Sequence, residues 1–169
     1  MRVVDEENKP VSGDGKGAIQ IKGPNVFRGY WRLPEKTQEE FTTDGWFRTG
    51  DIGTFDADGY LSIVGRAKDL IITGGYNVYP KEIEMVIDDL PAVSESAVIG
   101  LPDADFGEAV TAVVVVENGA QVDEAATIKT LKTKLAGYKV PKRVHVVDAL
   151  PRNAMGKVQK KLWRERFGQ

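Results

Sequence analysis

Apolar and polar positions alternate in two short stretches of the first 65 residues. Residues 17–23 (GAIQIKG) and 59–65 (GYLSIVG) carry apolar side chains at every second position, which is typical of half-buried strands. Between them, residues 33–41 (LPEKTQEEF) favour a short helix, with Pro34 suited to its first turn. We therefore expect short strands, turns and one short helix in this region.

After Arg66 the periodic segments become longer. Residues 68–75 (KDLIITGG) predict a short apolar strand that ends at two glycines. Residues 79–90 predict a helix, and Pro80 suits its start. The apolar positions of this helix share one face and are Ile83, Val86, Ile87 and Leu90.

The rest of the chain alternates between strands and helices. Residues 93–100, 109–117 and 143–148 are rich in valine and predict strands. Residues 159–167 (QKKLWRERF) predict a last short helix.

A longer amphipathic helix is predicted over residues 123–138. Asp123 is the expected N-cap and Gly137 the expected C-cap. The apolar stripe of this helix consists of Ile128, Leu131 and Leu135.

These elements predict an α+β fold class, with a small domain of mixed sheet and helices at residues 67–169. Residues 1–66 are rich in predicted strands. A segment of only about 65 residues is marginally stable when it folds alone. We expect residues 1–66 to be the β-rich end of a larger N-terminal domain.

Composition narrows the function classes. With 41% apolar and 28% charged residues, the chain has the balance of a soluble globular protein. It has no cysteine, which excludes a disulfide framework, a thiolate metal site and a cysteine nucleophile. The single histidine, His145, lies in an apolar strand and is expected to be structural. No apolar run approaches the ~20 residues of a membrane helix, and no signal-peptide pattern opens the chain, so we expect a cytoplasmic location without a membrane partner.

Charge is distributed unevenly along the chain. Residues 129–166 contain 12 Lys and Arg but 2 Asp and Glu, whereas the net charge of the whole chain is −2. Such a basic segment suggests a polyanionic partner, although a solvated helix face would give the same pattern.

The stretch LPRNAMGKV, residues 150–158, contains a glycine followed by Lys157 and raises the question of phosphate binding. A P-loop requires glycine where this chain has Pro151, and serine or threonine where it has Val158. The spacing therefore excludes a P-loop, and the spacing alone also allows Lys157 to be an ordinary solvated lysine.

Three stretches in this order resemble the core motifs of the adenylate-forming, or AMP-binding, superfamily. They are residues 45–51 (GWFRTGD), 65–84 (GRAKDLIITGGYNVYPKEIE) and 150–158. Within that superfamily the sequence is most similar to acyl-CoA synthetases, and among these to malonyl-CoA synthetases. The family's phosphate loop and acidic ATP motif, which belong to a large N-terminal domain, do not occur in these residues. The resemblance therefore implies a C-terminal portion that is inactive by itself.

The resemblance implies a reaction in two steps. A carboxylic acid, malonate-like by resemblance, attacks ATP that carries Mg²⁺, and coenzyme A then displaces AMP from the acyl-adenylate. Lys157 is the implied catalytic cation, and Asp51 and Arg66 are the implied nucleotide ligands. Lys68 falls at the family's hinge, where many members have aspartate. From their surroundings alone, Asp51 could instead be a turn residue and Arg66 a surface ion-pair partner.

The resemblance also implies a site for coenzyme A but no metal bound within this chain. The implied CoA-binding residues are Thr73, Gly74, Gly75, Tyr138, Lys142 and Arg143. Two glycines allow close approach of a thin pantetheine arm, although they also fit an ordinary tight turn. Tyr138 could stack on adenine, with Lys142 or Arg143 on phosphate. Phe106 is a weaker stacking candidate.

Two other functions stay open at this point. An adenylation domain would pass its acyl group to a carrier protein instead of CoA. A binding module for nucleic acid would use the basic segment with interleaved aromatic residues, but that segment has few aromatics apart from its last helix, so we expect no nucleic acid partner.

Overall fold

The computed structural model describes residues 1–117 and 119–168, and the chain divides into two compact units. The first unit is Met1–Lys68 and the second is Asp69–Gln169. The division falls two residues after the boundary expected from the sequence. A short 3₁₀ helix, Ala67–Asp69, contains the dividing position.

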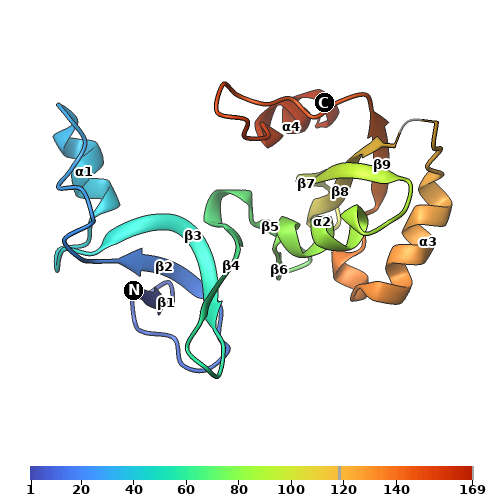
Figure 1. Ribbon diagram of the computed structural model, residues 1–169. Coiled ribbons are helices and arrows are strands. Elements are labelled where there is room, and N and C mark those ends of the chain that lie inside the picture. The colour runs from blue at the N-terminus through green and yellow to red at the C-terminus, as the bar shows by residue number, and fades with distance from the viewer. Residues whose placement is uncertain (118, 169) are drawn as a thin grey trace. The chain divides into compact units, whose positions relative to one another are not determined.

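The first unit is built on one antiparallel sheet (Figure 1). Its strands lie in the order in which they follow one another in the sequence, and are β1 (Arg2–Val4), β2 (Gly17–Ile21), β3 (Phe47–Phe55) and β4 (Leu61–Arg66). Helix α1 (Pro34–Glu40) lies in the connection between β2 and β3. Pro34 occupies the first turn of α1, as predicted.

The sequence predicted two of these four strands. β2 and β4 coincide with the alternating stretches and are confirmed. β1 and β3 were not predicted. The sequence of β3, FRTGDIGTF, has two glycines and little alternation, and its strand conformation comes from pairing with β2 on one side and β4 on the other.

The second unit is α+β and has a five-stranded mixed sheet (Figure 1). The strands are β5 (Ile71–Thr73), β6 (Tyr76–Val78), β7 (Val93–Asp103), β8 (Gly107–Val116) and β9 (Arg143–Val147). β8 pairs antiparallel with β7 along its whole length and parallel with β9 over Thr111–Val115. The short strand predicted within 68–75 is confirmed as β5, which ends just before Gly74 and Gly75. These two glycines turn the chain back into β6, which was not predicted.

Three α-helices and a 3₁₀ helix complete the second unit. They are α2 (Pro80–Asp88), α3 (Glu124–Lys134), the 3₁₀ helix Gly137–Lys139 and α4 (Lys160–Phe167). The predicted N-cap of α3 is confirmed, since Asp123 Oδ1 accepts a hydrogen bond of 2.8 Å from the Ala126 N–H. The predicted C-cap at Gly137 is wrong: Leu135 turns extended after Lys134, and Gly137 starts the 3₁₀ helix. Among the described residues, no helix is both long and apolar enough to cross a membrane.

The sheet of the second unit separates two apolar clusters. Alternate residues of β7 and β8 face opposite sides, so that Val98 and Ala112 belong to one cluster and Ile99 and Val113 to the other. The first cluster contains the apolar faces of α2 and α3, including the fully buried Ile83, Ile87 and Leu131. The second cluster contains Trp163 of α4. The sheet is thus covered by helices on both faces, and α4 lies on the face opposite to α2 and α3.

Candidate functional site

Lys157 lies in a tight turn that precedes α4. The Asn153 N–H donates to the Lys157 carbonyl at 3.0 Å, and Asn153 Oδ1 accepts from the Met155 and Lys157 N–H groups, each at 3.0 Å. Gly156 has a φ of 76°, a conformation that favours glycine. The backbone of the turn is therefore closed on itself. The Lys157 side chain is exposed and makes no hydrogen bond or ion pair with any described residue.

Asp51 and Arg66, the two predicted nucleotide ligands, are neighbours. They face each other across β3 and β4, and Arg66 Nε lies 2.9 Å from Asp51 Oδ1. The Asp51 side chain is 21% exposed and that of Arg66 is 49% exposed. The ion pair holds the carboxylate in place while both groups stay within reach of a ligand in solvent.

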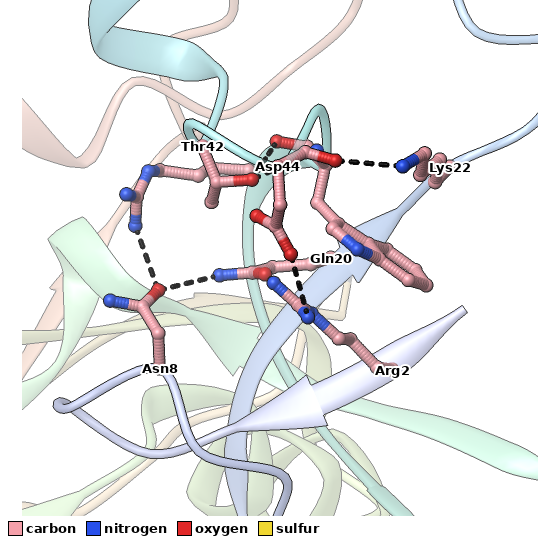
Figure 2. A network of polar contacts seen from close by, with 8 residues as sticks. Arg2, Asn8, Gln20, Lys22, Thr42 and Asp44 are labelled. Atoms are coloured by element: carbon pink, nitrogen blue, oxygen red, sulfur yellow. Dashed lines mark hydrogen bonds and ion pairs between the residues drawn. The ribbon is translucent and has the colours of Figure 1, made fainter.

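A polar network fixes the turn that leads into β3 (Figure 2). The side chain of Gln20 is buried, and it accepts from Arg2 Nε at 2.8 Å and donates to Asn8 Oδ1 at 2.9 Å. Arg2 also pairs with Asp44 at 3.3 Å, and the Asp44 carbonyl accepts from Lys22 Nζ at 2.7 Å. Because this turn opens β3, the network sets the start of the strand that carries Asp51.

Four of the six predicted CoA residues meet at a pocket of about 330 Å³ in the second unit. Its lining residues are Thr73, Gly74, Tyr76, Phe106, Val110, Gly137, Tyr138, Val140 and Lys142. Thr73, Gly74, Tyr138 and Lys142 among them were predicted from the sequence, although they are up to 69 positions apart. The Gly74 N–H donates to the Phe106 carbonyl at 2.9 Å, which joins the glycine turn to the pocket wall.

Aromatic rings and one cation define the mouth of this pocket. Tyr76 and Tyr138 stack with their ring centroids 4.6 Å apart. Lys142 Nζ lies 3.8 Å from the centroid of the Phe106 ring and 3.0 Å from Asp103 Oδ2. The hydrogen bond from Lys142 is the main cause that lowers the pKa of Asp103. The Asp103 carboxylate therefore stays ionised beside the cation.

Tyr138 is held in place through its neighbour. Lys139 Nζ lies 2.6 Å from Glu82 Oε2 of α2, and this hydrogen bond raises the pKa of Lys139. Because Lys139 closes the 3₁₀ helix that carries Tyr138, the ion pair fixes this helix against α2.

Three of the predicted residues lie away from the pocket lining. Gly75 is at the hairpin tip with a φ of 81°, and a Cβ added there would meet no atom within 4 Å. Arg143 pairs with Glu124 of α3 at 3.0 Å. Lys68 is exposed at the dividing position of the chain. Tyr76 lines the pocket but was not predicted, because its stacking partner is distant in the sequence.

Carboxylates neutralise much of the basic segment. Seven of its 12 basic side chains form ion pairs, all within the second unit: Lys139, Lys142, Arg143, Arg152, Lys160, Lys161 and Arg164. The asymmetry of charge along the sequence therefore largely reflects contacts of the fold. In the part of the chain that the structure describes, no group of three or more His, Asp or Glu side chains could hold a metal ion.

The class of the protein follows from the fold and these motifs together with its relatives. Residues 82–157 match the AMP-binding enzyme C-terminal domain. The matched region ends on Lys157 and contains strands β7, β8 and β9, helix α3 and most of helix α2. The chain carries the C-terminal domain of the AMP-binding enzymes and matches the C-terminal part of relatives that are named as CoA ligases.

Particular relatives fall within this class. The crystal structure of ATP-bound MatB from Rhodopseudomonas palustris is 58% identical and covers 99% of this chain with a TM-score of 0.94, while the chain covers 34% of that structure. Feruloyl-CoA synthase from Amycolatopsis sp is 46% identical over 99% of this chain and 34% of its own length. Malonate–CoA ligase from Arabidopsis thaliana is 45% identical over 95% of this chain and 28% of its own length. The chain thus spans about a third of the length of its relatives.

Proposed function

We propose that residues 1–169 act as the C-terminal third of a longer acyl-CoA synthetase. This enzyme would join a carboxylic acid to ATP, release pyrophosphate, and then transfer the acyl group from the adenylate to coenzyme A. Residues 1–66 would complete a large N-terminal domain, and residues 67–169 would be the mobile C-terminal domain. The length of the relatives, about three times that of this chain, supports a preceding region.

Lys157 is the catalytic cation of this proposal. The first step brings two anions together, a carboxylate and the α-phosphate, so positive charge is needed where they meet. The carrying observation is an exposed amine, without a partner among the described residues, on a turn that is closed by its own hydrogen bonds. The backbone that carries this amine is already fixed before substrate binds. No carboxylate of the described residues neutralises its positive charge.

Asp51 and Arg66 are the proposed nucleotide ligands. The Asp51 carboxylate can accept hydrogen bonds from both hydroxyl groups of a ribose. Arg66, paired with it at 2.9 Å, orients the carboxylate and supplies charge for a phosphate. Any Mg²⁺ would enter with ATP as part of the substrate. Lys68 is the proposed hinge, since the two units divide directly after it.

The pocket between the glycine turn and Tyr138 is the proposed site for coenzyme A. Gly74 allows the pantetheine arm to pass close to the backbone, and the stacked tyrosines offer an aromatic surface for adenine. Lys142 would bind phosphate, and Arg143 and Gly75 would act at the margin of the site. Relatives named as CoA ligases favour coenzyme A over a carrier protein.

A malonate-like acid is the proposed acyl substrate. Support comes from the similarity to malonate–CoA ligase, although feruloyl-CoA synthase is as similar over this region. We expect the proposed longer enzyme that contains residues 1–169 to release pyrophosphate faster with malonate than with ferulate. The opposite preference would replace malonate by an aromatic acid without affecting the roles of the residues above.

The function is tested in a joined enzyme, which carries residues 1–169 after the preceding region of the Rhodopseudomonas palustris enzyme. We expect Lys157→Ala to slow carboxylate-dependent pyrophosphate release by roughly 10²-fold or more, as does loss of one electrostatic stabiliser. Thioester formation from supplied acyl-adenylate should change little. Lys161→Ala, which removes an exposed lysine nearby, is the control. Equal losses in both steps, or no loss in either, would reject the proposed role of Lys157.

A further inference from the structure

Arg152 braces the turn that carries Lys157. Its Nη1 donates to the Gly156 carbonyl at 2.8 Å, and its Nη2 donates to the carboxylate of Glu95. One guanidinium therefore connects the residue before Lys157 to strand β7. We propose that Arg152 is a positioning residue that fixes where the turn presents Lys157. This inference rests on the catalytic role proposed for Lys157.

Within residues 1–117 and 119–168, the turn has no other polar connection to the sheet. Among the described residues, every hydrogen bond made by residues 153–157 joins these residues to one another or to Arg152. All five residues are exposed. The backbone hydrogen bonds close the turn, and Leu150 and Val158 at its base pack into the apolar cluster that contains Trp163. The Arg152 side chain adds the polar contact that orients the tip of the turn relative to the sheet.

Glu95 is a firm anchor for this brace. It lies in β7 and is paired in register with Val115 of the central strand β8. The chain on the far side of the turn is fixed as well, because Lys160 of α4 pairs with the buried Glu84 at 2.5 Å. The chain is thus fixed on both sides of the turn. Of the two anchoring side chains, that of Arg152 contacts the turn itself.

An arginine fits this role better than a lysine. Its planar guanidinium presents five donors in a fixed fork and can bind a carboxylate and a carbonyl at once. The side chains of Arg152 and Glu95 are 46% and 32% exposed, so their ion pair contributes little to stability. Its main effect is on orientation, and a misplacement of about 1 Å can slow a reaction by up to 10²-fold.

The test measures both half-reactions of the joined enzyme. We expect Arg152→Gln to slow pyrophosphate release by roughly tenfold and to leave thioester formation from supplied acyl-adenylate within about twofold of the unmodified enzyme. Arg152→Lys should recover part of the loss, and Glu95→Gln should lose less than Arg152→Gln because the bond to Gly156 remains. Lys161→Gln is the matched control and should leave both steps unchanged.

Hydrogen exchange gives a readout that does not depend on activity. Peptides that span residues 151–159 should exchange faster in Arg152→Gln than in the control, while peptides from β7 and β8 should not. The inference is overturned if Arg152→Gln keeps full pyrophosphate release, if both half-reactions fall equally, or if Arg152→Gln and Glu95→Gln both fail to fold.

Lys157→Ala, measured in parallel, separates the two proposals. Full pyrophosphate release in Lys157→Ala would overturn the proposed function, and the role of Arg152 with it. A loss in Lys157→Ala together with full release in Arg152→Gln would overturn the positioning role alone.

Discussion

Glu84 and Lys160 form a buried ion pair although 76 positions separate them in the sequence. Lys160 Nζ lies 2.5 Å from Glu84 Oε1, and the same oxygen accepts from the Val98 N–H at 2.9 Å. The side chain of Lys160 is 16% exposed and that of Glu84 is 9% exposed. The pair therefore joins α2, β7 and the start of α4 at one carboxylate.

We predict that Glu84→Ala lowers the free energy of unfolding by about 3–5 kcal/mol, because it leaves a half-buried ammonium group and a buried N–H without partners. Glu84→Gln should cost less, since its amide oxygen can still accept from Val98. Urea unfolding measures both. Glu165→Ala, which removes an exposed ion pair, is the control and should cost less than about 1 kcal/mol. Equal losses for all three variants would contradict the prediction.

The glycine turn between β5 and β6 offers a paired test. Gly74 has a φ of 56° and a Cβ there would meet the Phe106 ring at 3.2 Å, whereas a Cβ at Gly75 would meet nothing within 4 Å. Alanine at either position costs about 1–2 kcal/mol of backbone strain. Only Gly74→Ala must also displace Phe106 from the pocket wall. We expect it to weaken CoA binding more than Gly75→Ala does, as measured by calorimetry on the joined enzyme; equal affinities would argue against CoA in this pocket.

Lys142 should change its partner when coenzyme A binds. In the structure it pairs with Asp103, and a CoA phosphate would compete with that carboxylate. We predict that Lys142→Ala weakens CoA binding roughly tenfold, because a charge-assisted hydrogen bond to phosphate is lost. Asp103→Asn should strengthen CoA binding, because the carboxylate no longer competes with the phosphate for Lys142. Lys129→Ala, in the same basic segment, is the control. A weaker affinity in Asp103→Asn would show that the pair orients Lys142 rather than competing for it.

His145 should make stability depend on pH. Burial is the main cause that lowers its pKa, the nearby Arg143 adds to the effect, and Glu124 opposes it. The ring also stacks on Phe167 with centroids 4.0 Å apart. The unfolded chain then binds more protons than the folded one as the pH falls below the ordinary pKa of 6.5, so stability present above that pH is lost towards the folded pKa.

The measurement compares chemical unfolding at about pH 7.5 and about pH 5.5 for the unmodified chain and for His145→Asn. We expect the free energy of unfolding to fall between the two pH values in the unmodified chain and to fall less in the variant. The comparison uses the change with pH rather than the absolute stability, because His145→Asn also loses the stacking on Phe167. The same change in both proteins would show that His145 does not cause it.

Strong local patterns carried most of the fold that could be predicted. The helix starts at Pro34, Pro80 and Asp123 depend only on local backbone geometry and hydrogen bonding. The structure confirms all three helix starts. The strand β3 could not be read because its conformation depends on two partner strands. Gly137 failed as a cap because α3 ends three residues earlier, at Lys134.

Prediction of the candidate site followed the same division. The order of the motifs identified Lys157, Asp51 and the glycine turn as candidate site residues. The structure places Asp51 beside Arg66, and it places Gly74 and Tyr138 in the lining of one pocket. The roles of these residues remain predictions. The brace between Arg152 and Glu95 was beyond sequence reasoning, because it depends on two residues 57 positions apart meeting in the fold.

The hairpin of β5 and β6 is attached unevenly to the rest of its sheet. Ile71 and Val78 at its base are buried in the core, whereas β5 pairs with β8 at a single position, Thr73 opposite Gly107. Local opening of this tip breaks the Gly74–Phe106 hydrogen bond and separates Tyr76 from Tyr138, but it leaves the base buried, so its free energy is below that of global unfolding. The tip can consequently adapt its shape to a passing molecule, while the buried base returns it to the same resting position.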